Sequence, residues 1–159
     1  MPSFAIRTVF ATTSVAIALS LSPTDAAAQA PSGQQSLYQR LGGAYPIAAV
    51  VDAFIDALLV NDVLNANPAI NAARQRVPAA GLKYHVTALV CQATGGPCSC
   101  TGRSMKDSHA HLHISEREWQ AMLTDFRRIL NNFGVPAAEQ QELLAIVEST
   151  KPDIVVAGT

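Results

Sequence analysis

Two histidines, His85 and His109, are the residues of this 159-residue chain best suited to chemistry. Neutral imidazole is a common protein ligand for iron, zinc and copper. His85 comes three residues after Leu82 and four before Leu89, so a helix would put it on their apolar face. His109 follows a glycine-proline break, on a segment that can be placed independently. Two imidazoles facing one apolar cavity predict an iron held from both sides.

Helical patterns fill most of the chain around these histidines. Pro46, Pro78 and Pro136 are suited to first helical turns, and the apolar residues after them recur at helical spacing. Ser115 and Glu118 form a capping box that predicts another helix. No strand pattern is convincing, so the sequence predicts an all-α fold. The expected helices span residues 36–40, 46–61, 78–94, 105 to before 115, 116–133 and 136–150; residues 65–76 are expected to form short turns, and the apolar tail at 154–156 to pack on the core.

The first 30 residues are predicted to be a secretory signal peptide. Arg7 supplies a positive start, residues 9–21 are apolar, and the small residues up to Ala30 suit cleavage. A membrane anchor is the less favoured alternative, because the apolar stretch is shorter than the roughly 20 residues that span a bilayer. We expect a periplasmic or secreted protein with one domain at residues 31–159 and no membrane contact after cleavage.

Charge and cysteine content narrow the classes further. The net charge of −1 argues against a nucleic-acid partner. Three cysteines, Cys91, Cys98 and Cys100, leave one thiol over if a disulfide forms in an oxidising compartment. Cys91 can pair with Cys98 or with Cys100 more easily than Cys98 can pair with Cys100, and the sequence leaves this choice open.

Several motifs together resemble one family, the group I truncated haemoglobins. The resemblance extends from Ser36 to Val155 and is most specific between Gly95 and Ile114. The matching stretches are Leu37-Tyr38-Gln39-Arg40-Leu41-Gly42-Gly43, Val50-Val51-Asp52-Ala53-Phe54, Leu82-Lys83, Gly95-Gly96-Pro97, Gly102-Arg103-Ser104-Met105-Lys106 running into His109, Leu112, Ile114, Gly134-Val135-Pro136 and Asp153-Ile154-Val155.

This resemblance implies a two-over-two helical sandwich around haem b. His109 matches the proximal iron ligand, and His85 matches the position where some members place a distal histidine. The chain has no Cys-x-x-Cys-His motif, so the haem is expected to be non-covalent. Lys83 and Arg103 are expected to reach the haem propionates. The full set of expected haem-pocket residues is Phe54, Ile55, Leu82, Lys83, Val86, Arg103, Met105, Leu112, Ile114 and Trp119.

Two departures from the family pattern bear on function. Ile55 stands where most members have a tyrosine that hydrogen-bonds the bound gas, and Val86 stands where many have glutamine. A distal side without these donors favours a hexacoordinate, bis-histidyl iron over oxygen storage. We expect binding of a diatomic gas or electron transfer with a redox partner. The alternatives are a nitric oxide dioxygenase or peroxidase-like enzyme, and a non-haem metal protein.

The non-haem alternative uses the remaining polar residues of the same region. Cys98 and Cys100 followed by His109, His111 and His113 could bind zinc or copper. The simpler interpretation makes His111 and His113 surface residues, because alternate positions of a helix do not share a face. Cys100 is expected to be half of a loop disulfide, with a redox-sensing thiol as the alternative.

Overall fold

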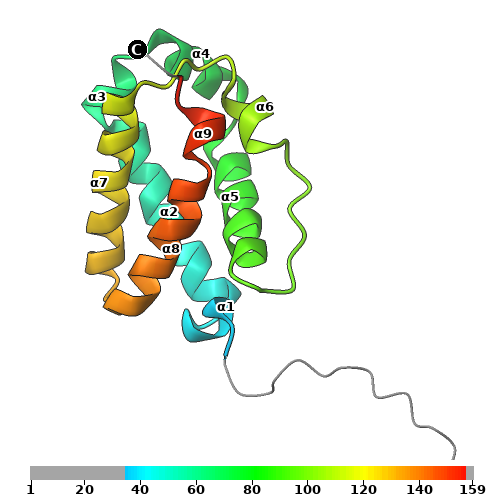
Figure 1. The fold of residues 1–159 in the computed structure, drawn as a ribbon. Helices are drawn as coiled ribbons and strands as arrows, with labels where there is room; N and C mark the ends of the chain where they lie inside the picture. Colours follow the sequence, from blue (N-terminus) through cyan, green and yellow to red (C-terminus); the bar gives the residue numbers. More distant parts are fainter. Residues whose placement is uncertain (1–34, 157–159) are drawn as a thin grey trace, which may run out of the picture. The chain divides into compact units, whose positions relative to one another are not determined.

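The computed structural model describes residues 35–156, so the predicted signal peptide lies outside the described residues. This part of the chain is helical, and its one β pairing is an isolated bridge between Ile114 and Val155. The all-α prediction is therefore confirmed. The helices are α1 (Leu37–Arg40), α2 (Ala44–Val60), α3 (Asp62–Asn65), α4 (Pro68–Arg76), α5 (Ala79–Ala93), α6 (Met105–His109), α7 (Glu116–Asn132), α8 (Ala137–Ser149) and α9 (Lys151–Ile154) (Figure 1).

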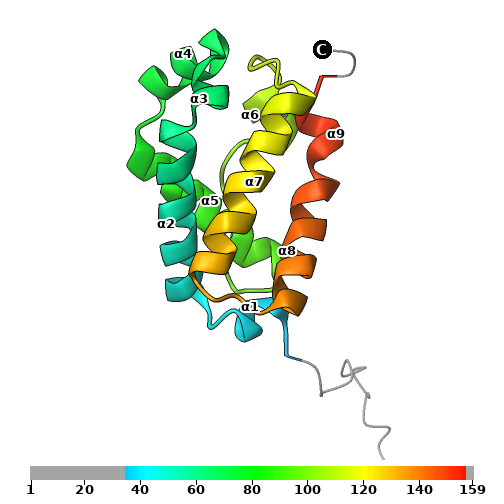
Figure 2. The ribbon, with the colours of Figure 1, turned by 90° about the vertical axis from the view of Figure 1, so that its left-hand side faces the viewer.

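The four long helices form two pairs. Helix α2 packs against α5 on one side and against α7 on the other. Helices α7 and α8 run side by side in both views (Figures 1 and 2) and share a hydrophobic cluster. This arrangement is the expected two-over-two sandwich, and it leaves α6 on the connection between the two pairs.

Regular rows of apolar side chains hold the α2–α5 pair together. Ile47, Val51 and Ile55 recur every four residues on α2 and are all buried. Their partners are on α5, at the same spacing: Leu82, Val86 and Val90. Rows of residues four apart lie along one face of each helix, so the two rows can pack lengthwise.

A second cluster joins the α2–α5 pair to the α7–α8 pair. Its buried members are Leu37, Phe126, Leu130 and Leu143. Phe54 of α2 packs against both clusters, and its ring lies 5.1 Å from that of Phe126 at a tilt of 57°. Tilted aromatic pairs at this distance contribute about 0.5–1.5 kcal/mol beyond their buried area.

The predicted capping box at the start of α7 is confirmed. The Ser115 hydroxyl accepts a hydrogen bond from the Glu118 backbone N–H, and the Ser115 backbone N–H donates to the Glu118 carboxylate at 2.7 Å. Each residue thus satisfies a backbone group that the helix leaves without a partner. Helix α7 consequently begins one residue after Ser115.

The prediction of short turns over residues 65–76 is wrong. Asn61 and Asn67 act as N-caps, because each side-chain oxygen accepts two backbone N–H groups of the helix that follows it. Pro68 occupies the first turn of α4, where no N–H is needed. Arg74 then donates to the carbonyl oxygens of Leu58 and Leu59, and so satisfies the end of α2.

The last long helix ends just before Lys151 and Pro152, as the sequence predicted. What the sequence did not predict is the short helix α9, which these two residues begin after Thr150. Proline is compatible with a first helical turn, so it ends α8 and starts α9. Helix α9 lies against α6, and the Val156 backbone N–H donates to the Ile114 carbonyl oxygen at 3.0 Å.

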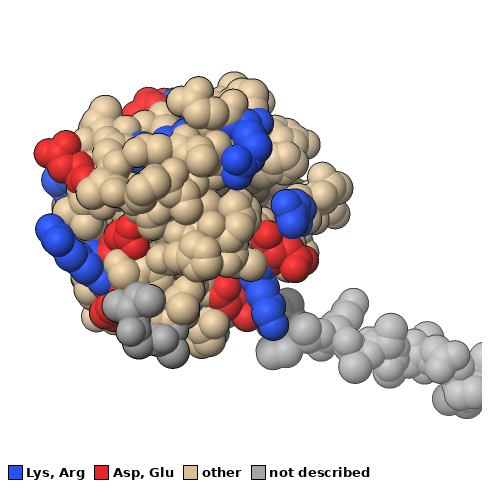
Figure 3. Space-filling view, turned by 90° about the horizontal axis from the view of Figure 1, so that it is seen from above, with Lys and Arg blue, Asp and Glu red and all other residues tan. Residues whose placement is uncertain are grey.

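The surface carries charges of both signs. Figure 3 views the domain from above and shows basic and acidic side chains interspersed around a broad uncharged area. Among residues 35–156, no helix has the length and apolar character that crossing a membrane requires.

Candidate functional site

A hollow of about 300 Å³ lies between α5 and the loop that leads to α6. It is at the lower end of the size range of small-molecule sites. Three consecutive turns of α5 face this loop through one row of side chains, because His85, Leu89 and Gln92 are spaced by four and three residues. The residues that line the hollow are Leu89, Gln92, Ala93, Cys100, Gly102, Arg103, Ser104 and Met105.

The loop is fastened to the end of α5 at two points. A disulfide joins Cys91, which is fully buried, to Cys98. The Cys100 backbone N–H donates to the Gln92 side-chain oxygen at 2.7 Å. The cysteine pairing that the sequence left open is thus Cys91–Cys98, and the expectation that Cys100 forms a disulfide is wrong, because Cys100 is the free thiol.

His109 is held in one orientation by its own helix. Its Nδ1 atom lies 2.8 Å from the Met105 carbonyl oxygen, one turn earlier in α6. A carbonyl oxygen can only accept, so Nδ1 carries the proton and Nε2 keeps its lone pair for a metal. Ser104 caps the helix by accepting from the Asp107 backbone N–H. The half-buried His109 therefore has the tautomer that an iron ligand needs.

His85 does not lie on the apolar face of α5 where the periodicity placed it. It is exposed and is not part of the partly buried row of Leu82 and Val86 that packs against α2. Each helical residue turns the chain by about 100°, so His85 falls on the neighbouring row with Leu89, facing the loop. Its ring meets the Tyr84 ring edge-on at 5.4 Å. Both histidines nevertheless belong to the two elements that border the hollow.

The other predicted pocket residues separate into distinct groups. Arg103 and Met105 line the hollow. Phe54, Ile55, Leu82 and Val86 instead form the packing between α2 and α5. These four residues belong to α2 and α5, and their contact with a cofactor stays a prediction.

Lys83 is engaged in ion pairs that fasten α5 to α2. Its ammonium lies 2.7 Å from an Asp52 carboxylate oxygen and 2.8 Å from one of Asp56. These hydrogen bonds raise the pKa of Lys83 above its ordinary value. Arg103, in contrast, is exposed and forms no ion pair with the residues that the structure describes. Arg103 is therefore the basic side chain more available to an anionic group.

Trp119, at the start of α7, provides an unexplained buried donor. The residue is 2% exposed, and its Nε1 has no hydrogen-bond partner among residues 35–156. Buried donors are almost always satisfied in folded proteins, so an unpartnered one calls for a reason. Nearby, Ile114 is buried and the Leu112 carbonyl accepts from the Asn67 side chain at 3.0 Å.

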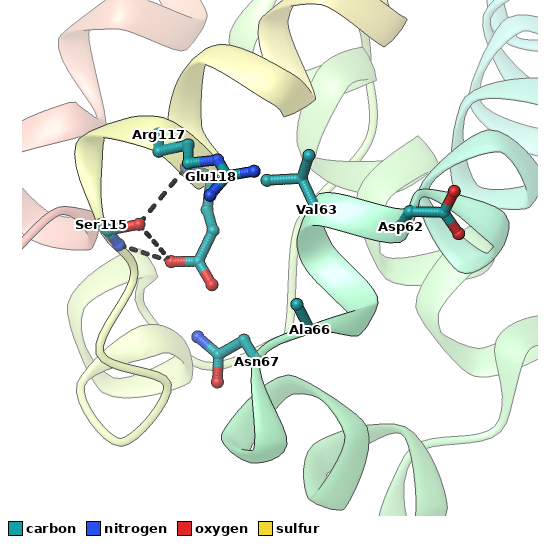
Figure 4. Close-up of a pocket in the computed structure, with 7 residues that line it drawn as sticks. All are labelled: Asp62, Val63, Ala66, Asn67, Ser115, Arg117 and Glu118. Atoms are coloured by element: carbon teal, nitrogen blue, oxygen red, sulfur yellow. Dashed lines mark hydrogen bonds between the residues drawn. The ribbon is translucent and has the colours of Figure 1, made fainter.

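A second hollow, of about 270 Å³, lies between α3 and the start of α7 (Figure 4). It contains no histidine. The Glu118 carboxylate faces Asn67 across it and is bonded to Ser115. Burial opposes ionisation of Glu118, but the bonds from Ser115 outweigh it and lower the pKa of the carboxyl. Because its buried carboxylate already has these partners, we assign this hollow a structural role.

The proposed metal cluster of cysteines and further histidines does not form. Cys98 is held in the disulfide, and His111 and His113 are exposed. Nowhere in residues 35–156 do three or more His, Cys, Asp or Glu side chains converge to bind a metal. The simpler interpretation of His111 and His113 as surface residues agrees with the structure.

The three lining residues that α5 contributes were not predicted to belong to the haem pocket, nor were three residues of the loop; the six are Leu89, Gln92, Ala93, Cys100, Gly102 and Ser104. Leu89 had been assigned to the apolar face alone. The signal was present in the sequence, because Leu89 and Gln92 follow His85 by four and seven residues. Residues four and seven positions after a histidine lie on the same face of a helix, so the contacts of Leu89 and Gln92 indicate what His85 faces.

The donor set fits iron in a porphyrin. The His109 imidazole has a free Nε2, the His85 imidazole lies beside the loop at Gly102, and Arg103 lines the hollow. In the first turn of α7, the indole N–H of Trp119 is buried without a hydrogen-bond partner among residues 35–156. A two-over-two helical domain with an imidazole on the short helix between its pairs is the architecture of a truncated globin.

The chain belongs to the bacterial-like globin family, whose model matches residues 36–156. It is 26% identical over 148 residues to group 1 truncated hemoglobin LI410 of Chlamydomonas moewusii, covering 92% of this chain and 81% of that protein. It is 28% identical over 116 residues to group 1 truncated hemoglobin GlbN of Synechocystis, covering 70% and 88%.

Solved structures agree on the fold. The truncated hemoglobin of Tetrahymena pyriformis in its Fe(III) form superposes with a TM-score of 0.64 at 21% identity, covering 76% of this chain and 98% of that one. The 2/2 hemoglobin of Synechococcus, in the cyanomet state with covalently attached heme, gives the same TM-score and coverage at 24% identity. The predicted family and fold are confirmed, and the chain is a haem-binding globin.

Proposed function

We propose that this globin binds one haem b non-covalently between α5 and α6, with His109 as the proximal ligand. The observation that carries the proposal is the hydrogen bond from His109 Nδ1 to the Met105 carbonyl oxygen, which leaves Nε2 available. An iron porphyrin in such a site supplies reversible binding of oxygen, nitric oxide or carbon monoxide, or transfer of one electron. The chain lacks a Cys-x-x-Cys-His motif, which supports non-covalent binding.

His85 is the proposed second axial ligand in the resting state. It lies on the row of α5 that faces the loop leading to α6, and external gases would compete with it. The side chains at the two positions where the family places distal donors, Ile55 and Val86, are apolar and packed between α2 and α5. The missing donors would weaken retention of a gas by roughly 1–3 kcal/mol, which supports rapid exchange or electron transfer over storage.

Arg103 is the proposed partner of a haem propionate. It borders the hollow, is exposed, and has no competing carboxylate among the described residues. Lys83 is a poorer candidate than the sequence suggested, because Asp52 and Asp56 already hold its ammonium. A guanidinium binds a carboxylate through two parallel hydrogen bonds, so Arg103 would also orient the porphyrin.

The place of action is proposed to be the periplasm or the exterior of the cell. The support is the signal-like sequence of residues 1–30, together with the Cys91–Cys98 disulfide, which persists in oxidising compartments. The measurement is the intact mass of the protein recovered from the periplasmic fraction. A mass that includes residues 1–30 would refute cleavage there.

Haem titration tests the binding proposal with an internal probe. Trp119 is the single tryptophan of the chain, and a bound porphyrin should quench its fluorescence as a Soret band grows. We expect His109→Ala to weaken haem affinity at least about tenfold, the effect of about 1.4 kcal/mol. His111→Ala, an exposed neighbour on the same segment, is the control and should bind as the wild type does.

The absorption spectrum tests the role of His85. The ferric wild type should be low-spin and hexacoordinate, and His85→Ala should be high-spin. A wild-type spectrum that is already high-spin and matches the variant would refute ligation by His85. A protein that takes up no haem and shows no Soret band would refute the whole proposal. Extraction of the pigment with acid and organic solvent separates non-covalent from covalent haem.

A further inference from the structure

We propose that Gly102 and Tyr84 form a resting position for the His85 ring, which the ring occupies whenever it is not an iron ligand. This inference rests on the proposed function, in which His85 alternates between bound and released states. The iron is one partner of His85 in this proposal, and the position formed by Gly102 and Tyr84 is the other. The balance between the two partners then sets how readily a gas reaches the iron.

Gly102 is in direct contact with the His85 ring. A Cβ built on Gly102 would lie 3.5 Å from His85 Nδ1 and 3.8 Å from His85 Cγ. The same point lies 3.6 Å from the Cys100 Sγ atom. The imidazole and the thiol therefore both border the same space beside Gly102.

The backbone conformation does not require glycine at this position. Gly42, Gly43, Gly95 and Gly134 have positive φ angles, but Gly102 does not. The glycine instead leaves room for the His85 ring beside the loop. An alanine would make ordinary contacts there, whereas a branched side chain would extend into the space that the ring occupies.

Tyr84 also contacts the His85 ring. Its side chain is 67% exposed, and its ring meets that of His85 edge-on at 5.4 Å and 70°. An edge-to-face aromatic contact is favourable, and this one supports the ring at the helix surface. Without His85 as its neighbour, Tyr84 would be an exposed aromatic residue with no aromatic partner among the described residues.

The loop that provides this position is fixed relative to α5. The Cys91–Cys98 disulfide and the hydrogen bond from the Cys100 N–H to Gln92 hold it at the end of the helix. Ser104 holds its other end as the cap of α6. A fixed partner competes with the iron for the ring, and its loss shifts the population toward the iron-bound state.

Ferric spectra and carbon monoxide binding to the ferrous protein test the competition. Gly102→Val and Tyr84→Ala should each raise the ratio of hexacoordinate to pentacoordinate protein and slow gas binding, by roughly two- to tenfold. Tyr45→Ala should resemble the wild type. Tyr45 is a suitable control because it is an exposed tyrosine, at 91%, on another helix.

Alkylation of Cys100 in the haem-free protein gives a readout that is independent of iron. Tyr84→Ala and His85→Ala should react faster than the wild type, and Tyr45→Ala should react at the wild-type rate. The disulfide leaves Cys100 as the thiol that reacts. Thermal melts confirm that the compared variants are folded.

The outcomes separate the two proposals. If His85→Ala shows ligation but Gly102→Val and Tyr84→Ala match their controls in both assays, the resting position is wrong and the proposed function stands. If His85→Ala leaves the spectrum unchanged, ligation by His85 is wrong and the competition between the iron and the resting position is overturned with it, whereas haem binding through His109 stands. Unchanged alkylation in both His85→Ala and Tyr84→Ala overturns the resting position whatever the spectra show.

Discussion

The Nδ1 atom of His109 donates to the backbone carbonyl oxygen of Met105, one turn earlier in the same short helix, at 2.8 Å. The bond uses only the backbone of its partner, so the side chain at position 105 can vary without disturbing it. It fixes both the tautomer and the orientation of the ring before any metal is bound. The five-residue helix α6 thus orders the His109 ring, and the conformational entropy of the ring is lost during folding rather than when a metal binds.

Ile55 allows the missing distal hydroxyl to be restored. Ile55→Tyr should slow oxygen release by roughly 5- to 150-fold, because a hydroxyl near the gas adds about 1–3 kcal/mol of hydrogen bonding. Ile55 is 2% exposed, so the larger ring should also lower the free energy of unfolding by about 1–3 kcal/mol. Ile55→Phe is the matched control, since it adds the ring without the hydroxyl. Equal oxygen release from the Tyr and Phe variants would contradict the prediction.

Two glycines should respond to alanine in opposite directions. A Cβ at Gly96 would lie 2.5 Å from Tyr38 Cδ2 and 2.7 Å from the Cys91 carbonyl oxygen, so Gly96→Ala should destabilise by about 1–3 kcal/mol. Gly81 lies within α5 with nothing within 4 Å of a Cβ, so Gly81→Ala should stabilise by about 0.5–1 kcal/mol. Urea unfolding of both variants measures the two changes, and the same sign for both would refute the argument.

Glu118 makes stability depend on pH in the acid range. Its pKa in the folded protein lies below the ordinary 4.5, so the stabilisation is present above pH 4.5 and is lost as the pH falls through the folded pKa. Glu118→Gln should cost about 1 kcal/mol at pH 7, and the difference from the wild type should shrink below pH 4.5. The exposed Glu148→Gln is the control. A Glu118→Gln difference that stays constant from pH 7 to pH 3 would count against this assignment.

His113 is held in a left-handed backbone conformation, with φ at 50°, between α6 and α7. This region is unfavourable for residues with a Cβ and open to glycine. His113→Gly should therefore stabilise the fold by about 0.5–1 kcal/mol. His111→Gly, on the same exposed segment without a positive φ, should be neutral or destabilising. Thermal melts of both variants measure the two changes in stability. A lower melting temperature for His113→Gly would show that the lost contacts of the His113 side chain outweigh the relief of its backbone conformation.

Local signals in the sequence predicted most of the fold. The capping box of Ser115 and Glu118 defines the start of α7 because it depends on only four neighbouring residues. The family motifs around His109 likewise lie within one short stretch, and the structure gives this histidine the tautomer that a ligand needs. The resemblance to truncated haemoglobins was sufficient to predict the two-over-two helical sandwich.

Features that depend on distant or ambiguous contacts were missed. Asparagines indicate turns and also cap helices, so the sequence around Asn61 and Asn67 did not reveal α3 and α4. The cysteine pairing depends on how closely the loop approaches α5, and Gly96 permits that approach. The face of His85 was misassigned because residues three and four apart were treated as one stripe, whereas α5 uses two neighbouring rows for two different partners.

The bridge between Ile114 and Val155 has a practical consequence for how this protein is engineered. The last described residues are paired with the segment between α6 and α7, and α9 rests on α6 itself. A fusion partner or purification tag attached directly after Val156 would emerge close to the histidine-bearing helix. Labels are better introduced through exposed side chains of α4, and truncation before Val155 should be avoided when haem affinity is measured.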